Sequence, residues 1–373
     1  MNRAALLGGT ALVAVMAALP ATAGTVGTGD SLAVTLEGEV RVSLNFRDQD
    51  ITAGTGRGFG LHTDEAELVI EARNVADNGI LYGVQIVLNV NTDDTTNGDK
   101  VFAFIDDDND RLGRIEIGDT DDVIDNMIVG GYSVLAGRAG YDGELADVIA
   151  MGDNWFGIHK GNTGKATKIN YFTPRIAGFQ VGVSLTPDTG SQGASFSQRD
   201  DNGDYENVFS VAANYVGAYD NLTVTLAIGA EFGDGETSTG AATSGDAETF
   251  VIGATVEFGS FSVGAGYGDL AEGGITDANQ ALGQDAGEYW NVGAKYASGP
   301  WAVSVGYYRS EISNQAGVGD TKHTVLSFDG EYEIAPGWTF AGSLNFADAE
   351  NRNRTAGDDN DGTALILYNN FAF

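Results

Sequence analysis

The chain has 373 residues and is strongly acidic, with 53 Asp and Glu residues against 19 Lys and Arg residues and a formal net charge of −34. This charge argues against nucleic acid as a partner, because a polyanionic chain repels phosphates. Cysteine is absent, so the fold must rest on hydrogen-bonded closure or on a large core rather than on disulfides.

Residues 1–23 have the pattern of a secretory signal peptide. Arg3 precedes an apolar run from Ala4 to Leu19, and Ala21 and Ala23 form an Ala-x-Ala cleavage pattern. The run is shorter than the roughly 20 residues that a membrane-spanning helix needs. We therefore expect cleavage before Gly24 and an exported mature chain of residues 24–373.

Residues 32–46 alternate in polarity. Every second residue from Leu32 to Phe46 is apolar or glycine, while most residues between them are polar or charged. This period of two indicates a β-strand with one apolar face and one wet face. The same alternation predicts sixteen strands, at residues 32–46, 61–74, 80–91, 99–105, 112–118, 166–173, 179–187, 207–216, 222–232, 247–258, 261–269, 287–297, 301–311, 321–334, 338–348 and 363–373.

The connections between these strands are alternately short and long. Transmembrane β-barrels have short periplasmic turns and long external loops, and an even number of strands closes the barrel without an exposed edge. We therefore predict an all-β, transmembrane antiparallel β-barrel. Outward aromatic residues beside the short turns predict a periplasmic girdle. They are Phe179, Phe258, Phe261, Trp301, Tyr332, Trp338, Phe371 and Phe373.

The longest connection, residues 119–165, carries an acidic excess. Residues 119–153 contain eight carboxylates against one base, Arg138, and they include apolar and aromatic residues that must pack against something. We expect this loop to fold inside the barrel and to narrow its bore. The candidate acids are Asp119, Asp121, Asp122, Asp125, Asp142, Glu144 and Asp147. We rank the first four higher because they leave the strand first.

Three segments resemble general porins of alphaproteobacterial type: residues 113–119 (GRIEIGD), 171–184 (YFTPRIAGFQVGVS) and 368–373 (YNNFAF). The resemblance implies a trimeric barrel of sixteen strands in the outer membrane, for passive diffusion of ions and small solutes. It implies a third loop folded into the lumen as an eyelet. It also implies contact with the lipid bilayer and lipopolysaccharide, and a terminal Phe373 that the barrel-assembly machinery reads.

In such an eyelet, loop carboxylates oppose basic residues on the wall. Inward positions supply Arg41, Arg73, Arg114, Lys168 and Lys295, of which the first three are the best candidates. Inward positions also supply eleven acids: Glu37, Glu39, Glu65, Glu67, Glu71, Glu116, Glu231, Glu257, Asp329, Glu331 and Glu333. We therefore expect a moderate cation preference, which a tight cluster of the three arginines would oppose. The first three strands carry mostly aliphatic residues outward, and we expect that arc to touch a neighbouring subunit.

The sequence gives no support to catalysis. The histidines His62, His159 and His323 lie in three separate regions, none of them spaced with a Ser or Asp as general-base chemistry requires. We expect each to be a solvated residue of a loop or strand end. No imidazole metal site is indicated either.

Two further alternatives stay open. Residues 106–110 (DDDND) resemble the start of a calcium loop but lack its Gly and its Glu, so we predict no cofactor, while calcium bridging by loop carboxylates remains open. A substrate-selective channel is the alternative function. It would need an aromatic track or a basic ladder, and the inward aromatic residues are few: Tyr289, Tyr308 and Tyr368.

Overall fold

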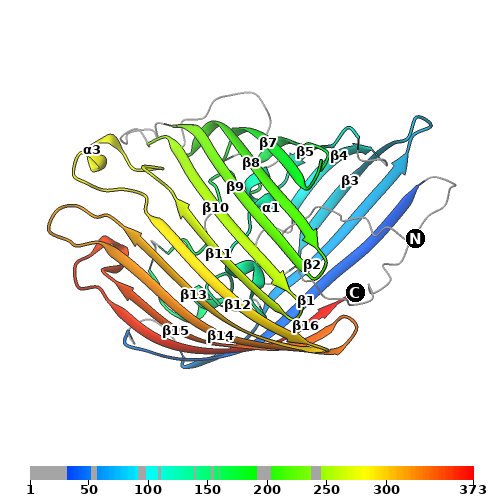
Figure 1. Cartoon of the computed structure of the whole chain (residues 1–373). Helices are drawn as coiled ribbons and strands as arrows, with labels where there is room; N and C mark the ends of the chain where they lie inside the picture. Colours follow the sequence, from blue (N-terminus) through cyan, green and yellow to red (C-terminus); the bar gives the residue numbers. More distant parts are fainter. Residues whose placement is uncertain are drawn as a thin grey trace.

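The structure is a computed structural model that describes residues 32–51, 57–90, 98–107, 111–137, 140–152, 155–158, 160–190, 203–236 and 245–373. Its described residues form a closed barrel of sixteen strands in which sequence neighbours pair antiparallel and β1 pairs with β16 (Figure 1). The predicted fold is thereby confirmed. The predicted signal peptide and Gly24 lie outside the described residues, as do Asp153, His159 and Arg138.

The strands are β1 (Ala33–Gln49), β2 (Phe59–Val75), β3 (Ile80–Asn89), β4 (Gly98–Asp107), β5 (Arg114–Asp119), β6 (Thr167–Phe172), β7 (Phe179–Asp188), β8 (Tyr205–Tyr219), β9 (Leu222–Gly235), β10 (Ala247–Phe258), β11 (Phe261–Asp269), β12 (Glu288–Ser298), β13 (Trp301–Ile312), β14 (Thr321–Ala335), β15 (Trp338–Glu350) and β16 (Asn360–Ala372). Several extend beyond their predicted ends on the long-loop side. The β1–β16 ladder, for example, continues to the pair Gln49 and Gly362. Backbone pairing thus persists where both faces have become polar and the alternation that predicts a strand has ended.

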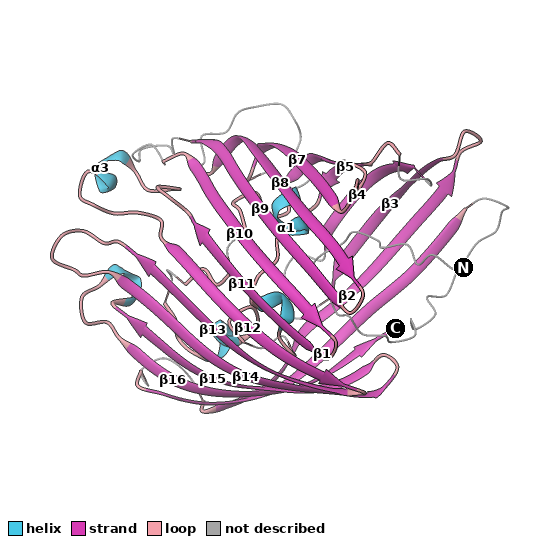
Figure 2. Cartoon of the chain, in the orientation of Figure 1, coloured by secondary structure: helices cyan, strands magenta, loops and turns pink. Residues whose placement is uncertain are grey.

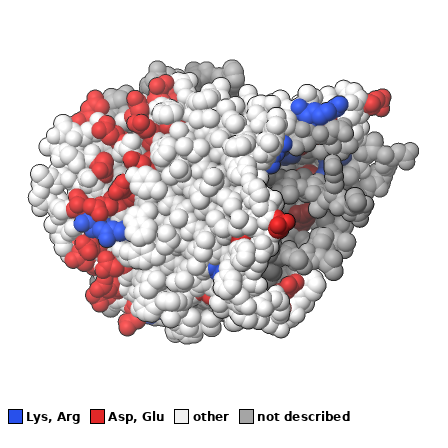
Figure 3. All heavy atoms as spheres, in the orientation of Figure 1, with Lys and Arg blue, Asp and Glu red and all other residues white. Residues whose placement is uncertain are grey.

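The outer surface of the barrel is apolar between two polar ends. The eight predicted girdle residues are all exposed, from 39% for Trp338 to 61% for Phe179. Figure 3 shows a broad uncharged band over the middle of this face, with acidic side chains gathered at the left. Apolar side chains facing outward suit contact with lipid.

The last residue of the chain extends the β1–β16 pairing that closes the barrel. Phe373 donates its backbone N–H to Gly38 O at 2.9 Å, and Gly38 N–H donates to Phe373 O at 3.0 Å. The Phe373 ring lies over Gly38 so closely that a Cβ at residue 38 would stand 2.7 Å from its Cζ atom. Glycine at residue 38 is therefore what allows the terminal ring to pack against β1.

The loop between β5 and β6 enters the bore, as predicted. It forms α1 (Val123–Met127), the 3-10 helix η1 (Tyr132–Val134) and α2 (Leu145–Val148), and Figure 2 shows short helices inside the ring of strands. The external loops hold α3 (Asp277–Gln280) and the 3-10 helix η2 (Arg352–Arg354). Within the described residues, no helix combines the length and hydropathy required to cross a membrane.

Candidate functional site

The internal loop follows the inner wall of the barrel. Its first helix, α1, contacts β6 to β9, η1 contacts β11 and β12, and α2 contacts β1. The returning limb comes back to β9 and β10, where Asn162 Nδ2 donates to Glu231 Oε1 at 2.7 Å and lies 3.3 Å from Thr249 Oγ1. The loop therefore spans most of the circumference of the barrel.

Glycines on the inner wall make room for the loop backbone. A Cβ at Gly253 would overlap the carbonyl oxygen of Val129, and one at Gly264 would stand 2.5 Å from Gly130 O. Gly293 on β12 likewise lies against Gly131. The alternation of residue types predicts strands but does not show this close contact, because glycine fits either face. What the sequence does show is that glycine recurs at inward positions of adjacent strands, and this recurrence indicates the close contact.

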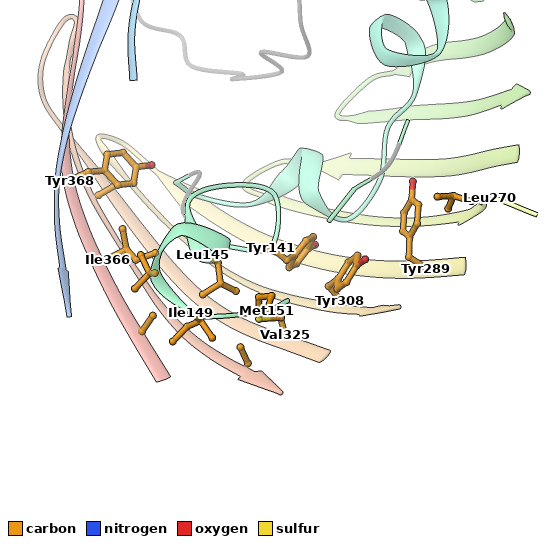
Figure 4. Packing of buried hydrophobic residues seen from close by; sticks show 14 residues of the cluster. Tyr141, Leu145, Ile149, Met151, Leu270, Tyr289, Tyr308, Val325, Ile366 and Tyr368 are labelled. Atoms are coloured by element: carbon orange, nitrogen blue, oxygen red, sulfur yellow. The ribbon is translucent and has the colours of Figure 1, made fainter. Parts of the chain in front are cut away.

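Two apolar clusters fix the loop on the wall. Val123, Ile124 and Met127 of α1 pack with Phe172, Ala212, Ala227 and Val251. Leu145, Ile149 and Met151 pack with Tyr308, Val325 and Ile366 on the other side of the bore (Figure 4). Burial of these side chains gives the loop a defined position rather than a range of positions.

The four acids at the start of the loop hold its base. Asp119 accepts from Thr167 Oγ1, and Asp121 forms an ion pair with Lys100 on β4. Asp125 Oδ1 lies 2.9 Å from Lys160 Nζ, on the returning limb. Burial opposes ionisation of Asp125, but the Lys160 ammonium outweighs it and lowers the pKa of the carboxyl. These three acids are therefore paired within the loop or with the strands beside it.

Asp122 has a different role at the same place. Its Oδ1 accepts from the backbone N–H groups of Ile124 and Asp125, at 2.9 and 3.0 Å, so it caps the N-terminus of α1. Burial raises the pKa of Asp122 to about 6. The capping contacts explain why an acid stands at this buried position.

Lys168 is not part of an open basic wall, which corrects the prediction. It is 1% exposed, and its Nζ donates to the carbonyl oxygens of Thr120, Gly164 and Ala166. Position on an inward face does not ensure exposure, because the two ends of the loop cover this part of β6. Lys100, which the prediction omitted, also faces inward. It stands two and four residues before Phe102 and Phe104 on β4, and this even spacing places all three side chains on the same face.

Glu144 is the loop acid that contacts a wall arginine. Arg41 Nη1 donates to Glu144 Oε1 at 3.0 Å, and Glu39 lies 3.6 Å from Arg41 Nη2. The Arg41 guanidinium also stands over the Tyr368 ring, 5.3 Å from its centroid. The higher rank given to Asp119, Asp121, Asp122 and Asp125 does not hold for Arg41, because the loop runs along the wall before it meets this arginine.

The charge on Glu144 depends on its surroundings. Burial raises the pKa of the Glu144 carboxyl to about 7, although the Arg41 guanidinium opposes this shift. Of the two other candidates in this half of the loop, Asp147 is exposed, while Asp142 is half-buried like Glu144. Accessible acids thus occur around α2 and also at the base of the loop, where the Asp125 side chain is 38% exposed.

The three wall arginines do not form one tight cluster. Arg73 stands opposite Ala33 on β1, eight residues before Arg41, which is roughly 27 Å along a strand. Each arginine pairs with an acid two positions away on its own strand: Arg41 with Glu39, Arg73 with Glu71 at 3.6 Å and Arg114 with Glu116 at 2.7 Å. The tight arginine cluster that would oppose a cation preference is therefore absent from the described residues.

Lys295 lies apart from the other bases. It is half-buried on β12, opposite Ser262 and Ser304. Within the described ranges, no carboxylate lies at ion-pair distance from it. Lys295 thus belongs to a different part of the wall from Arg41 and the loop acids.

A β-bulge adds an acid that the sequence pattern missed. The β1–β2 register shifts between Arg41 and Val42, so that Glu65 and Thr63 have partners on β1 and Asp64 has none. Both carboxylate oxygens of Asp64 are buried despite its outward position in the alternation. Two adjacent acids, Asp64 and Glu65, in one strand were the available signal, because a lipid-facing carboxylate is costly.

The histidines are not all solvated. His62 is exposed on β2, but His323 is fully buried on β14, where Nε2 donates to Met151 O at 3.0 Å and Nδ1 lies 3.1 Å from Ser310 Oγ. The expectation for His323 was wrong because the internal loop covers it. In the part of the chain that the structure describes, no group of three His, Cys, Asp or Glu residues could hold a metal ion. Calcium bridging by the loops stays untested.

The comparisons with known proteins agree with this architecture. A family model described as Gram-negative porin matches residues 9–353. Uncharacterized proteins of Rickettsia conorii and Rickettsia prowazekii are each 25% identical to the chain over 78% of both lengths.

Solved structures of bacterial outer-membrane proteins have the same fold. An anion-selective porin from Comamonas acidovorans has a TM-score of 0.62 at 15% identity and covers 92% of this chain and 100% of its own. A mutant of the Rh. blastica porin has a TM-score of 0.58 at 18% identity, over 91% of this chain and 100% of its own. The trimer form of OmpT from Vibrio cholerae has a TM-score of 0.59 at 13% identity, over 92% and 100%.

Proposed function

The chain belongs to the Gram-negative porin family, and on that premise we propose that it forms a water-filled channel for passive diffusion of ions and small hydrophilic solutes. The protein is a multi-pass β-barrel of the outer membrane. The observation that carries the proposal is an internal loop seated on the wall by apolar contacts, with charged residues left accessible inside the ring. The side chains of the inward-facing residues Glu39 and Arg73 are 23% and 35% exposed.

We further propose a moderate preference for cations. Arg41 contacts both Glu39 and Glu144, so its charge is offset where the loop meets β1. Asp147 is exposed on the loop, and Glu65 and Glu67 are half-buried on the facing β2. Charges along a narrow bore act on a passing ion within a Debye length of about 10 Å at 0.1 M salt. The acids around α2 and β2 thus favour cations, and added salt is expected to weaken the preference.

The alternative of a substrate-selective channel receives less support. Its aromatic track would require accessible rings, whereas Tyr289, Tyr308 and Tyr368 are 4%, 0% and 4% exposed beneath the internal loop. Liposome swelling with sugars of graded size separates the two functions. A size limit without chemical preference supports diffusion, and uptake of one sugar far above others of equal size contradicts it. Catalysis has no support in the site, and we propose no enzymatic role.

We propose that the barrel assembles as a trimer through the aliphatic outer face of β1 to β3. Leu36 and Val84 are among the exposed residues of this arc, at 42% and 45%. A denaturing gel of the detergent-extracted protein, run unheated and heated, tests this proposal. A heat-labile oligomer supports it, whereas a monomer band in both lanes contradicts it.

Export and insertion complete the proposal. We propose removal of residues 1–23, contact with lipid and lipopolysaccharide, and recognition of Phe373 by the barrel-assembly machinery. N-terminal sequencing of the outer-membrane protein is expected to begin at Gly24. A sequence beginning at Met1 would contradict the proposed cleavage.

A further inference from the structure

Residues 148–152 of the internal loop, here called the tip segment, are held by side chains from several parts of the barrel. Arg47 Nη1 on β1 donates to Val148 O at 2.7 Å, and Gln49 Oε1 accepts from Ala150 N–H at 3.0 Å. His323 on β14 donates to Met151 O. These contacts fix the backbone of the tip segment, whatever its side chains are.

One of the anchors comes from an external loop, residues 351–359. Arg352 Nη1 donates to Ala150 O at 2.8 Å, and the same carbonyl accepts from Asn360 Nδ2 at 3.1 Å. Arg352 Nη2 also donates to Asp358 Oδ1 at 2.8 Å, which fixes the guanidinium within its own loop. Arg352 is 8% exposed. A single buried guanidinium thus joins the external loop to the tip segment.

The backbones of the two loops approach each other closely at this point. Gly152 has a φ of +90°, and a Cβ on it would stand 3.0 Å from Arg352 Cβ and 3.0 Å from Asn353 Oδ1. On the other side, Asn351, Asn353 and Arg354 all have left-handed φ angles, between 46° and 54°. Asparagine adopts such conformations more readily than most residues, but Arg354 does so only where surrounding contacts impose it. The fit around Arg352 is therefore built into both loops.

The external loop is itself tied to its neighbours by a second arginine. Arg354 Nη1 donates to Ser313 O at 2.9 Å, and Arg354 Nη2 donates to Asp285 O at 2.9 Å. Ser313 belongs to the connection between β13 and β14, and Asp285 to the connection between β11 and β12. Arg354 therefore links external loops to one another, whereas Arg352 links them to the loop inside the bore.

We propose that Arg352 is a positioning residue for the channel: it couples the external loop 351–359 to the tip segment and so keeps the constriction open at a fixed width. The inference rests on the proposed channel function. The other contacts of the tip segment remain when the hydrogen bond from Arg352 to Ala150 is lost, so we expect brief excursions of the segment into the bore rather than its release from the wall. A hydrogen bond from a charged donor changes such an equilibrium by roughly tenfold or more.

Single-channel recording in planar bilayers tests the coupling with two matched variants. Arg352→Gln is expected to add brief partial closures to the open-channel current, with roughly tenfold more time spent in them. Arg354→Gln removes the same charge from the same loop without touching the tip segment, so it serves as the control and should conduct like the wild type. A role only in folding would lower the yield of heat-modifiable protein without altering the current of the channels that form.

A reversible variant compares two states of channels that have already assembled. The chain has no cysteine, and the 3.0 Å gap between the two Cβ positions is about 0.5 Å below the roughly 3.5–4.5 Å that a disulfide spans, so the loops must separate slightly. The φ of +90° at Gly152 adds a backbone cost for cysteine there. Oxidised Gly152→Cys/Arg352→Cys should conduct quietly, and reductant should produce the partial closures. The inference is overturned if Arg352→Gln matches Arg354→Gln or if reductant changes nothing. A wild type that conducts no ions would instead refute the channel function itself.

Discussion

Arg41 of β1 and Glu144, the residue before α2, lie 3.0 Å apart across the inside of the barrel. This pair is the point at which the far end of the internal loop meets the wall. Arg41 is 4% exposed and so depends on its acidic neighbours, because an unpaired buried charge is costly. The pair therefore sets both the position of the loop and the charge that an ion meets there.

Removal of the Glu144 charge should reduce cation preference. Arg41 has two ion-pair partners, Glu39 and Glu144, and only Glu39 remains charged in Glu144→Gln. Because less of the positive charge of Arg41 is then offset, the anion-to-cation permeability ratio should rise. The reversal potential under a gradient of one salt measures the ratio. Asp277→Asn, on exposed α3, is the control, since an external charge is largely screened. Equal ratios in Glu144→Gln and Asp277→Asn would refute this role.

The cation preference should also depend on pH. Because the pKa of Glu144 is about 7, this carboxyl gains its negative charge as pH rises from about 6 to 8, and cation preference should rise with it. The stability of the folded loop has the opposite pH dependence. A raised carboxyl pKa stabilises the folded loop at low pH, and this stabilisation is lost as pH rises through about 7. Permeability ratios measured across this range in the wild type should show the step. Glu144→Gln should not show it, and an unchanged step in the variant would contradict the assignment.

Gly253 is expected to tolerate no side chain. In Gly253→Ala the added Cβ overlaps Val129 O, so the loop must shift, at a cost of about 1–3 kcal/mol. Unfolding of the detergent-solubilised barrel and single-channel conductance should both change. Gly330→Ala is the matched control, because the nearest atom to its added Cβ is 3.8 Å away. Wild-type conductance in Gly253→Ala would show that the loop does not rest on this glycine.

Deletion of Phe373 should lower the amount of assembled barrel more than the stability of the barrel once it has formed. Phe373 exchanges two backbone hydrogen bonds with Gly38, yet its side chain is 55% exposed and buries little area. The amount of heat-modifiable protein and the melting temperature measure the two effects separately. Normal amounts of a barrel that melts early would reverse this ranking.

The sequence predicts the barrel well because an outward apolar row and an inward polar row repeat in every strand, as from Leu32 to Phe46. It predicts the internal loop for a similar reason, since apolar residues such as Ile124 and Leu145 must be buried. The alternation of inward and outward residues does not reveal which inward residues the loop covers. Lys168 and Arg41 both face inward, but the first binds loop carbonyls and the second meets Glu144.

The partners of the loop acids could not be predicted because they depend on the path of the loop in space. Asp121 and Glu144 are both acids of the same loop, yet one pairs with β4 and the other with β1. The bulge at Asp64 was missed because a strict period of two assigns that residue to the outer face. In each case a three-dimensional contact overrides a local pattern.

The reversal potential of the wild-type channel under a KCl gradient tests the central claim most directly. Glu144, Asp147 and the acids of β2 make the bore acidic, so the account predicts a reversal potential whose sign shows that K⁺ crosses more readily than Cl⁻. The magnitude of this potential should decline as both salt concentrations rise. A potential of the opposite sign, set by Cl⁻, would contradict the account of an acidic constriction. The absence of any channel current would contradict the proposed function as a whole.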